Sequence, residues 1–290
     1  MYTTPTKPRL GMYEKAMPDD FTWQQRFETA AEMGFDFIEI SVDESEHRSA
    51  RLDWSDEDIY ALRRLSEQYG MPIQSLCLSL HRAYPFGSAD PNKREKALEI
   101  MKKAIAFAYK LGVRCIQLAG YDVYYEPSTA DSHRHFVAGM KASAALAEQA
   151  GLLLAVEIME TPYLNSLSKF EIIKREVPSP FFMAYPDVGN ISAWHYDVPT
   201  ELKLSQHHVV QIHLKDTLKT RGDQPGQYRD LVIGEGEVDF PNIFSALADI
   251  QYRGPLVIEM WANDDKNWKE NLVIAKQRIH QFAQQSHFEL

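Results

Sequence analysis

Long apolar runs and a secretory leader are both missing from this sequence. No apolar stretch approaches the roughly 18 residues that a membrane-spanning helix needs. The residues from Met1 to Leu10 mix Thr, Pro and Lys without the apolar core of a signal peptide. We therefore expect neither a membrane protein nor a secreted protein, and the predicted location is the cytoplasm.

Cysteine and net positive charge are scarce as well. The two cysteines, Cys77 and Cys115, each lie in an apolar run and are expected to be buried thiols rather than a disulfide framework. A net charge of −10 repels phosphate polymers, so a nucleic acid is not an expected partner. These features do not determine the oligomeric state, and a homodimer is compatible with them.

The chain repeats one local pattern: an amphipathic segment, a glycine, then a short apolar run. The glycines favour a left-handed residue just after a helix; they are Gly34, Gly70, Gly112, Gly151 and Gly254. Helix starts are predicted at Ser55–Asp58, as a capping box, and at Asp90-Pro91. The predicted strands are Arg9–Glu14, Phe37–Ser41, Pro72–Ser79, Cys115–Ala119, Leu152–Ile158, Phe181–Asp187, Val209–Leu214 and Leu256–Met260.

Strict alternation of strand and helix predicts an α/β fold with a parallel sheet. Eight repeats without a linker favour a single (β/α)8 TIM barrel domain over residues 1–290. No Gly-x-Gly-x-x-Gly turn follows the first strand, so dinucleotide binding is not expected. The segments after the strands are long, as in 186–199 and 215–239, and in barrels such loops build the active site.

Four polar residues lie at the ends of the last four strands: Glu157, Asp187, His213 and Glu259. Alternation of side chains places Glu157 with Leu153 and Ala155, and His213 with Val209 and Gln211, on the inward face. The opposite faces, such as Leu154-Val156-Ile158 and Val210-Ile212-Leu214, are aliphatic and suit packing against helices. The four polar side chains should converge at the mouth of the barrel.

Three converging carboxylates would repel one another unless a cation holds them. Three oxygen ligands and one imidazole suit one divalent ion, Zn²⁺ or Mn²⁺. Each residue alone has a structural alternative, since a glutamate at the rim can pair with Arg or Lys and a histidine can be a hydrogen-bonded core residue. Four such residues at consecutive strand ends favour the metal site.

Other polar residues near strand ends are candidates for binding a substrate. Basic side chains gathered on an acidic protein suggest an anionic group in the substrate, although solvated loop charges are the alternative interpretation. The candidates are Glu14, Lys15, His81, Arg82, Asn190, Lys215 and Lys219.

From Gly11 to Trp261 the sequence resembles the xylose-isomerase-like barrels, and more closely the bacterial L-ribulose-5-phosphate 3-epimerases (L-xylulose-5-phosphate 3-epimerases) of ascorbate breakdown. The motifs that carry the resemblance are Gly11–Pro18, Phe35–Asp43, Cys77–Arg82, Ile116–Asp122, Glu157–Met159, Tyr185–Asn190, His213–Thr217, Gly234–Gly236 and Ile258–Trp261. Related free-ketose epimerases have a His near Asn190 and an Arg near Lys219, and this chain departs from them at both positions.

The resemblance implies an isomerase with a Glu-Asp-His-Glu metal site, in which Glu157 and Glu259 double as acid and base. The expected reaction interconverts L-xylulose 5-phosphate and L-ribulose 5-phosphate through a cis-enediolate, with a small ketose phosphate as the substrate and neither a nucleic acid nor a membrane as a partner. If both glutamates were ligands alone, Glu14 and Glu39 would be the nearest alternative bases.

Three other functions compete with this one. An aldose-ketose isomerase could use the same ligands but would move hydrogen between C1 and C2. An apurinic-site endonuclease of similar fold needs several zinc ions and a basic DNA face, which the net charge of −10 disfavours. A sugar-binding regulator would retain the metal site without turnover.

Overall fold

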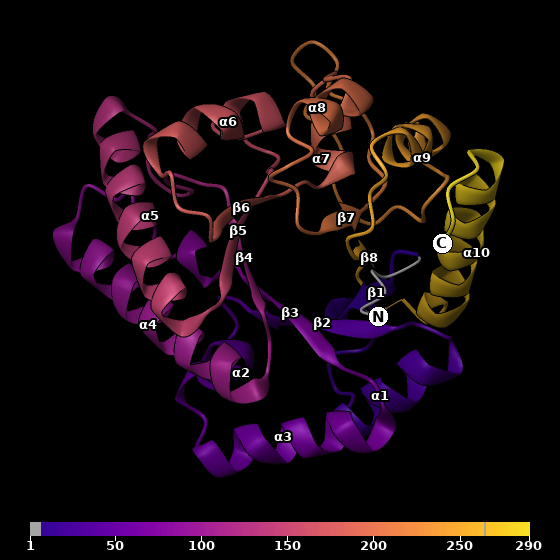
Figure 1. Cartoon of the computed structure of the whole chain (residues 1–290), viewed down its shortest axis with the longest axis horizontal. Helices are drawn as coiled ribbons and strands as arrows, with labels where there is room; N and C mark the ends of the chain where they lie inside the picture. The colour runs from indigo at the N-terminus through magenta and orange to yellow at the C-terminus, as the bar shows by residue number, and fades with distance from the viewer. Residues whose placement is uncertain (1–6, 264) are drawn as a thin grey trace, which may run out of the picture.

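The strands form one parallel sheet that curves into a barrel. The computed structural model describes residues 7–263 and 265–290, so most of the stretch from Met1 to Leu10, in which no signal peptide was expected, lies outside the described residues. The sheet has the strand order β6-β5-β4-β3-β2-β1-β8-β7, and Figure 1 shows helices around it. The strands are β1 Leu10–Tyr13, β2 Phe37–Val42, β3 Ile73–Leu78, β4 Cys115–Ala119, β5 Leu153–Glu157, β6 Phe182–Tyr185, β7 Ile212–Leu214 and β8 Leu256–Ile258.

The barrel closes between β6 and β7 through isolated parallel bridges. Ala184 pairs with Val209 and Asp187 with His213, and the His213 N–H donates to the Pro186 carbonyl at 2.9 Å. The predicted (β/α)8 TIM barrel is confirmed. Its extent as one domain over residues 1–290 stays a prediction.

Helices follow the strands in the predicted alternation. They are α1 Trp23–Glu32, α2 Glu46–Ser49, α3 Asp56–Tyr69, α4 Pro91–Leu111, α5 Ala130–Ala150, α6 Leu167–Glu176, α7 Val188–Ala193, α8 Val198–Leu204, α9 Phe240–Asp249 and α10 Trp268–Gln285, with 3-10 turns η1 Glu14–Ala16, η2 Ala50–Asp53 and η3 Leu80–Arg82. Ser55 caps α3 by accepting from the Asp58 N–H, and Asp90 caps α4 ahead of Pro91. None of the helices in the described ranges is long and apolar enough to cross a bilayer.

Four of the five predicted helix-to-strand glycines have a positive φ, namely Gly34, Gly70, Gly112 and Gly151. The prediction is wrong at Gly254, because Gln251 takes the left-handed conformation after α9, with φ 53°. Gly254 instead leaves room for a neighbouring ring: a Cβ there would lie 2.4 Å from the Tyr252 hydroxyl. A close approach, not a helix end, requires this glycine.

The inward face of the barrel is unusually polar above its base. Glu39, Ser75, Gln117 and Gln211 are buried there, whereas barrel interiors are more often filled with branched aliphatic residues. The predicted alternation fails at one point: Val209 packs against the outer core and Val210 against the inner Tyr185 cluster. Regular pairing of β7 begins only at Ile212, so the alternating pattern does not extend back to Val209.

Both cysteines are buried and free, as predicted. They point into the barrel, where Cys77 packs with Tyr13, Phe37 and Val257.

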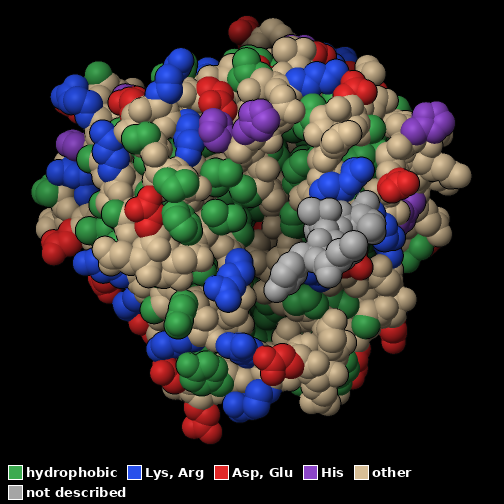
Figure 2. Space-filling view, in the orientation of Figure 1, with side chains coloured by type: hydrophobic (Ala, Val, Ile, Leu, Met, Phe, Trp, Pro, Cys, Tyr) green, Lys and Arg blue, Asp and Glu red, His purple; other side chains and the backbone are tan. Residues whose placement is uncertain are grey.

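On the face that Figure 2 shows, acidic and basic side chains are interspersed.

His81 lies in η3, under the first turns of α4. Its side chain is buried, its ring centroid lies 4.7 Å from that of Phe86, and its Nε2 lies 3.0 Å from the Ala97 carbonyl oxygen. Burial lowers the pKa of His81 from 6.5 to about 4. The ring is therefore neutral near pH 7.

This burial predicts a loss of stability in acid. Unfolded His81 takes up a proton near pH 6.5 while the folded residue resists protonation down to about pH 4, so acidification favours unfolding within that window. The linkage amounts to about 2 kcal/mol at pH 5. In urea unfolding at pH 7 and pH 5, His81→Gln should lose about 2 kcal/mol less on acidification than the wild type. Equal losses in the two proteins would contradict this account.

Candidate metal centre

The barrel brings the four predicted ligand residues together. Glu157 ends β5, Asp187 caps α7, His213 lies in β7 and Glu259 follows β8. One ligand atom from each lies within 4.8 Å of the others, and all four residues are buried. The shared position follows from the fold, because the carboxyl ends of parallel barrel strands meet at one rim.

Asp187 is held by the chain around it. It follows the inward residues Met183 and Tyr185 with the same alternation. Its Oδ1 accepts from the Asn190 N–H at 3.0 Å, which caps α7. The other oxygen, Oδ2, is thereby left to face the cluster.

His213 and Lys215 supply the positive charge that offsets the buried carboxylates. His213 Nδ1 lies 2.9 Å from Glu157 Oε1 and 3.7 Å from Glu259 Oε2. Lys215 Nζ lies 2.5 Å from Asp187 Oδ2 and 3.1 Å from Glu259 Oε2. Gln117 donates to Glu157 Oε2 from the neighbouring strand.

Burial and mutual repulsion shift the carboxyl groups unequally. Burial raises the pKa of Asp187 to about 7, and the neighbouring Glu259 and Glu157 charges add to the shift against the opposing Lys215. Burial also raises the pKa of Glu157. For Glu259 the charges of Lys215 and His213 outweigh burial and lower its pKa to about 2. The buried carboxylates repel one another, and binding of a compact cation between them would stabilise their charged forms.

The donor set fits such a cation. Asp187 Oδ2 and Glu259 Oε2 are buried and have no hydrogen-bond partner among the described residues, although Lys215 lies within ion-pair distance of both. Buried oxygens that lack a hydrogen bond are costly unless a ligand satisfies them. Three carboxylates and an imidazole could hold one Zn²⁺ or Mn²⁺.

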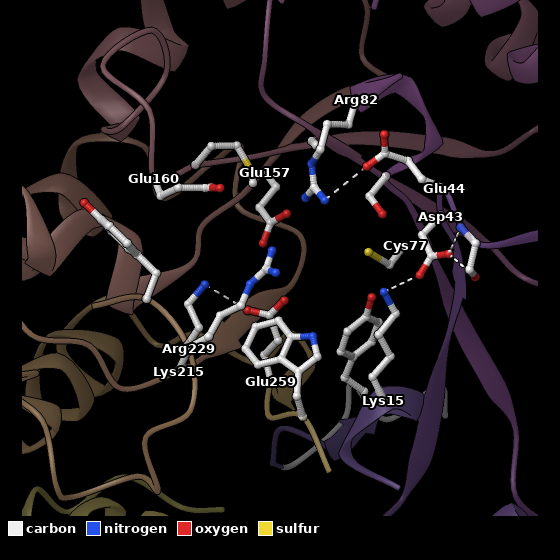
Figure 3. A pocket seen from close by; sticks show the side chains of 17 residues that line it. Lys15, Asp43, Glu44, Cys77, Arg82, Glu157, Glu160, Lys215, Arg229 and Glu259 are labelled. Atoms are coloured by element: carbon white, nitrogen blue, oxygen red, sulfur yellow. Dashed lines mark hydrogen bonds and ion pairs between the residues drawn. The ribbon is translucent and has the colours of Figure 1, made fainter. Parts of the chain in front are cut away.

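A cavity of about 210 Å³ opens beside this cluster. Glu157 and Glu259 line it, whereas Asp187 and His213 are fully buried behind them and do not. Figure 3 shows both glutamate side chains directed into this cavity. Two of the four predicted ligands therefore face the space where a substrate would bind.

Three of the predicted substrate contacts line this cavity: Lys15, Arg82 and Lys215. Lys15 forms an ion pair with Asp43, and Arg82 lies 3.5 Å from Glu44 and over the Tyr124 ring. Figure 3 shows both pairs at one side of the cavity.

The other four predicted contacts do not line this cavity. Glu14 is fully buried and paired with Arg48 and Arg51, and His81 is neutral under α4. Asn190 uses its side-chain amide to donate to the Ile158 carbonyl at 2.9 Å. Lys219 lies in the 215–239 segment, where its backbone N–H donates to Glu237. Glu39, an alternative base, is also fully buried outside the cavity wall.

Several lining residues were not found from the sequence. They include Asp43, Glu44, Glu160, Tyr228, Arg229 and Trp261. Trp261 lies two residues past Glu259, so its place at the strand end was a usable signal. Arg229 follows a short hairpin in the 215–239 segment, held by the Leu218–Gln227 bridge, and no periodic pattern marks it.

Comparisons with known proteins agree with this geometry. Residues 27–278 match the family described as xylose isomerase-like TIM barrel. The putative L-ribulose-5-phosphate 3-epimerase SgbU of Escherichia coli K12 is 46% identical over 280 residues, covering 97% of this chain and 98% of its own. The L-ribulose-5-phosphate 3-epimerase UlaE of Shigella boydii is 44% identical and covers 92% of both chains.

Solved structures share the fold at low sequence identity. D-psicose 3-epimerase from Clostridium cellulolyticum H10 has a TM-score of 0.78 at 18% identity, covering 95% of this chain and 99% of its own. An L-ribulose 3-epimerase has a TM-score of 0.77 at 18% identity, covering 97% and 96%. The expectation of an isomerase of the carbohydrate epimerase class is confirmed, and the chain belongs to the xylose isomerase-like TIM barrel family, among the L-ribulose-5-phosphate 3-epimerases.

Proposed function

We propose that this protein interconverts L-xylulose 5-phosphate and L-ribulose 5-phosphate by inverting C3, with one Zn²⁺ or Mn²⁺ held by Glu157, Asp187, His213 and Glu259. The names of the relatives at 44–46% identity support the reaction. The fit of the four side chains to a divalent ion supports the metal requirement.

One observation carries the catalytic roles: of the four clustered residues, Glu157 and Glu259 are the two that line the cavity. Inversion needs a base on one face of C3 and an acid on the other. Glu157 comes from β5 and Glu259 follows β8, so the carboxylates approach the cavity from different sides of the barrel. Each can hold or give up a proton there, while Asp187 and His213 are out of a substrate's reach.

The proposed reaction removes the weakly acidic C3 proton next to the C2 carbonyl. A bound divalent ion supplies Lewis acidity, worth several kcal/mol, to the substrate oxygens that gain negative charge. One glutamate accepts the proton and the other returns one to the opposite face, each contributing roughly a factor of 10²–10⁴. Trp261 and Tyr13 form an edge-to-face aromatic pair that lines the cavity with the two carboxylates.

The cationic side chains of the cavity support a phosphorylated substrate. Lys15 and Arg82 face Asp43 and Glu44, and Lys215 lies between Asp187 and Glu259. Arg229 stacks over Trp261 at 5.1 Å and forms no ion pair with any carboxylate that the structure describes. Its charge is therefore the most available one for a phosphate, with Arg82 and Lys15 as further contacts.

Other expectations stay predictions. They are a cytoplasmic location, a role in ascorbate breakdown, a homodimer, and a small ketose phosphate as the partner rather than a nucleic acid or a membrane.

The function is tested first by metal removal. Because three buried carboxylates and an imidazole converge at one point, chelation should abolish epimerisation and added Mn²⁺ or Zn²⁺ should restore it. The assay follows exchange of substrate hydrogen with deuterated water, and label at C3 is expected. Full activity in protein that elemental analysis shows to be metal-free would sink the proposal. Label at C1 or C2 would favour an aldose-ketose isomerase.

The two glutamates are separated by Glu157→Gln and Glu259→Gln. Each variant keeps a neutral oxygen near the metal but loses a proton acceptor, so kcat should fall by about 10²-fold or more while KM changes less. Each should still wash out the C3 proton of one epimer, and the two variants should do so for opposite epimers.

Metal content must be measured in the same samples, because an amide binds a divalent ion more weakly than a carboxylate. Glu57→Gln, at an exposed position on α3, is the matched control and should behave as wild type. Near-normal inversion by either metal-loaded variant would place the acid or base on another residue.

Phosphate recognition is tested at Arg229. Loss of one charge-assisted hydrogen bond, worth about 1.5–3 kcal/mol, predicts that Arg229→Ala raises KM for the 5-phosphate by roughly 10-fold to 100-fold. Turnover of the free ketopentose should be unchanged. Arg134→Ala, on the exposed face of α5, is the control. If the wild type uses free ketopentoses as efficiently as their 5-phosphates, the cations of the cavity have another role.

A further inference from the structure

A fully buried carboxylate lies behind the metal cluster and has no place in the reaction proposed so far. Glu39, in the middle of β2, has no exposed surface and does not line the cavity. Its Oε1 lies 2.6 Å from His213 Nε2. Among the described residues His213 is the one ionic partner of Glu39, so the Glu39 carboxylate forms no ion pair with an Arg or Lys there. A buried carboxylate of this kind is expensive unless its hydrogen bonds are complete.

The second oxygen of Glu39 is surrounded by donors. Oε2 accepts from Ser75 Oγ at 2.6 Å and from Tyr185 Oη at 2.8 Å. Gln211 Nε2 lies 2.8 Å from the same serine oxygen and 2.7 Å from the same tyrosine oxygen. An amide nitrogen only donates, so each hydroxyl accepts from Gln211 and must direct its own hydrogen to Glu39. The network therefore has one direction, from Gln211 through the two hydroxyls to Glu39.

This direction determines the state of the histidine. An ionised carboxylate accepts at both oxygens, Oε2 from the two hydroxyls and Oε1 from the imidazole, so His213 Nε2 carries the hydrogen between them. A histidine that binds a metal is neutral, and the other nitrogen, Nδ1, then has the free lone pair. Nδ1 is the nitrogen on the cluster side, 2.9 Å from Glu157 Oε1. The Tyr185 ring, 4.6 Å from the imidazole at 65°, keeps the ring in this orientation.

We infer that Glu39 is a positioning residue that fixes His213 as the Nε2–H tautomer and so presents Nδ1 as the metal-binding atom. The inference rests on the proposed metal site and assigns no contact with substrate to Glu39. A histidine that donates its second N–H to a carboxylate is oriented and made a more basic ligand. Such partners typically change metal affinity by about 10-fold to 100-fold.

The test replaces the carboxylate and measures metal binding rather than turnover. Glu39→Gln is nearly isosteric and keeps one acceptor for Nε2–H, but loses the charge and mismatches the Ser75 and Tyr185 donors. Its dissociation constant for Zn²⁺, measured by competition with a chelator, should rise by about 10-fold to 100-fold. Glu171→Gln is the matched control: it breaks another carboxylate–histidine pair, with His208 at 2.8 Å and a Ser205 donor, on helix α6. Its Zn²⁺ affinity should equal that of the wild type.

A spectroscopic readout separates positioning from a general loss of stability. In Zn²⁺-loaded protein with nitrogen-15 histidine, His213 should show a protonated, strongly hydrogen-bonded Nε2 and a metal-bound Nδ1, identified by loss of the signal in His213→Gln. Glu39→Gln should move the Nε2 proton signal. If that variant does not fold, Tyr185→Phe removes one donor to Glu39, keeps the ring against His213, and should weaken Zn²⁺ binding in the same direction.

The outcomes distinguish this inference from the proposed reaction. Metal bound through His213 Nε2, or an unchanged Zn²⁺ affinity in Glu39→Gln, overturns the role of Glu39 even in an active epimerase. A wild type that binds Zn²⁺ through Nδ1 but leaves the C3 proton unexchanged refutes the reaction and supports Glu39. A wild type that binds no divalent metal overturns both.

Discussion

The buried carboxylates at the mouth of the barrel are the constraint on which the site depends. Glu39, Glu157, Asp187 and Glu259 are all buried, and among the described residues the basic side chains in contact with them are His213 and Lys215. An isolated buried charge strongly destabilises a protein, so carboxylate oxygens that face no basic side chain need hydrogen bonds from neutral donors. This requirement explains why Gln117, Ser75 and Gln211 occupy inward positions that a purely structural barrel would fill with aliphatic side chains.

The buried carboxylates form two layers that differ in their hydrogen bonding. The inner layer, around Glu39, is closed by its own hydrogen bonds and has no access to the cavity. In the outer layer, Asp187 Oδ2 and Glu259 Oε2 lack hydrogen bonds within the described part of the chain. A satisfied network stays rigid while unsatisfied oxygens attract a ligand. A preorganised ion site requires both features: a rigid inner layer that holds the ligand residues in place, and acceptor oxygens in the outer layer that lack hydrogen bonds.

The sequence predicted those features that repeat or alternate. Strand order, the rim position of the four clustered residues and most helix ends follow from periodicity and glycine placement, and the structure contains them. Predictions failed where tertiary contacts override a local pattern. His81 follows a strand, but its side chain is buried under α4. Glu14 forms ion pairs with Arg48 and Arg51. Gly254 leaves space for the Tyr252 ring. Arg229 could not be found, because it follows a short hairpin, bridged at Leu218–Gln227 and Arg221–Gln224, that no periodic pattern marks.

Lys215 illustrates why residue type alone does not assign a role. As a lysine two residues past a strand-end histidine it resembles a phosphate contact, but its ammonium lies between Asp187 and Glu259. These carboxylates, with burial opposing, raise its pKa well above the usual value. A cation whose field is already balanced by two carboxylates has little attraction left for a third anion. The phosphate of the proposed substrate would therefore rely on other cations that line the cavity: Arg229, which forms no ion pair within the described part of the chain, and Arg82, which lies 3.5 Å from Glu44.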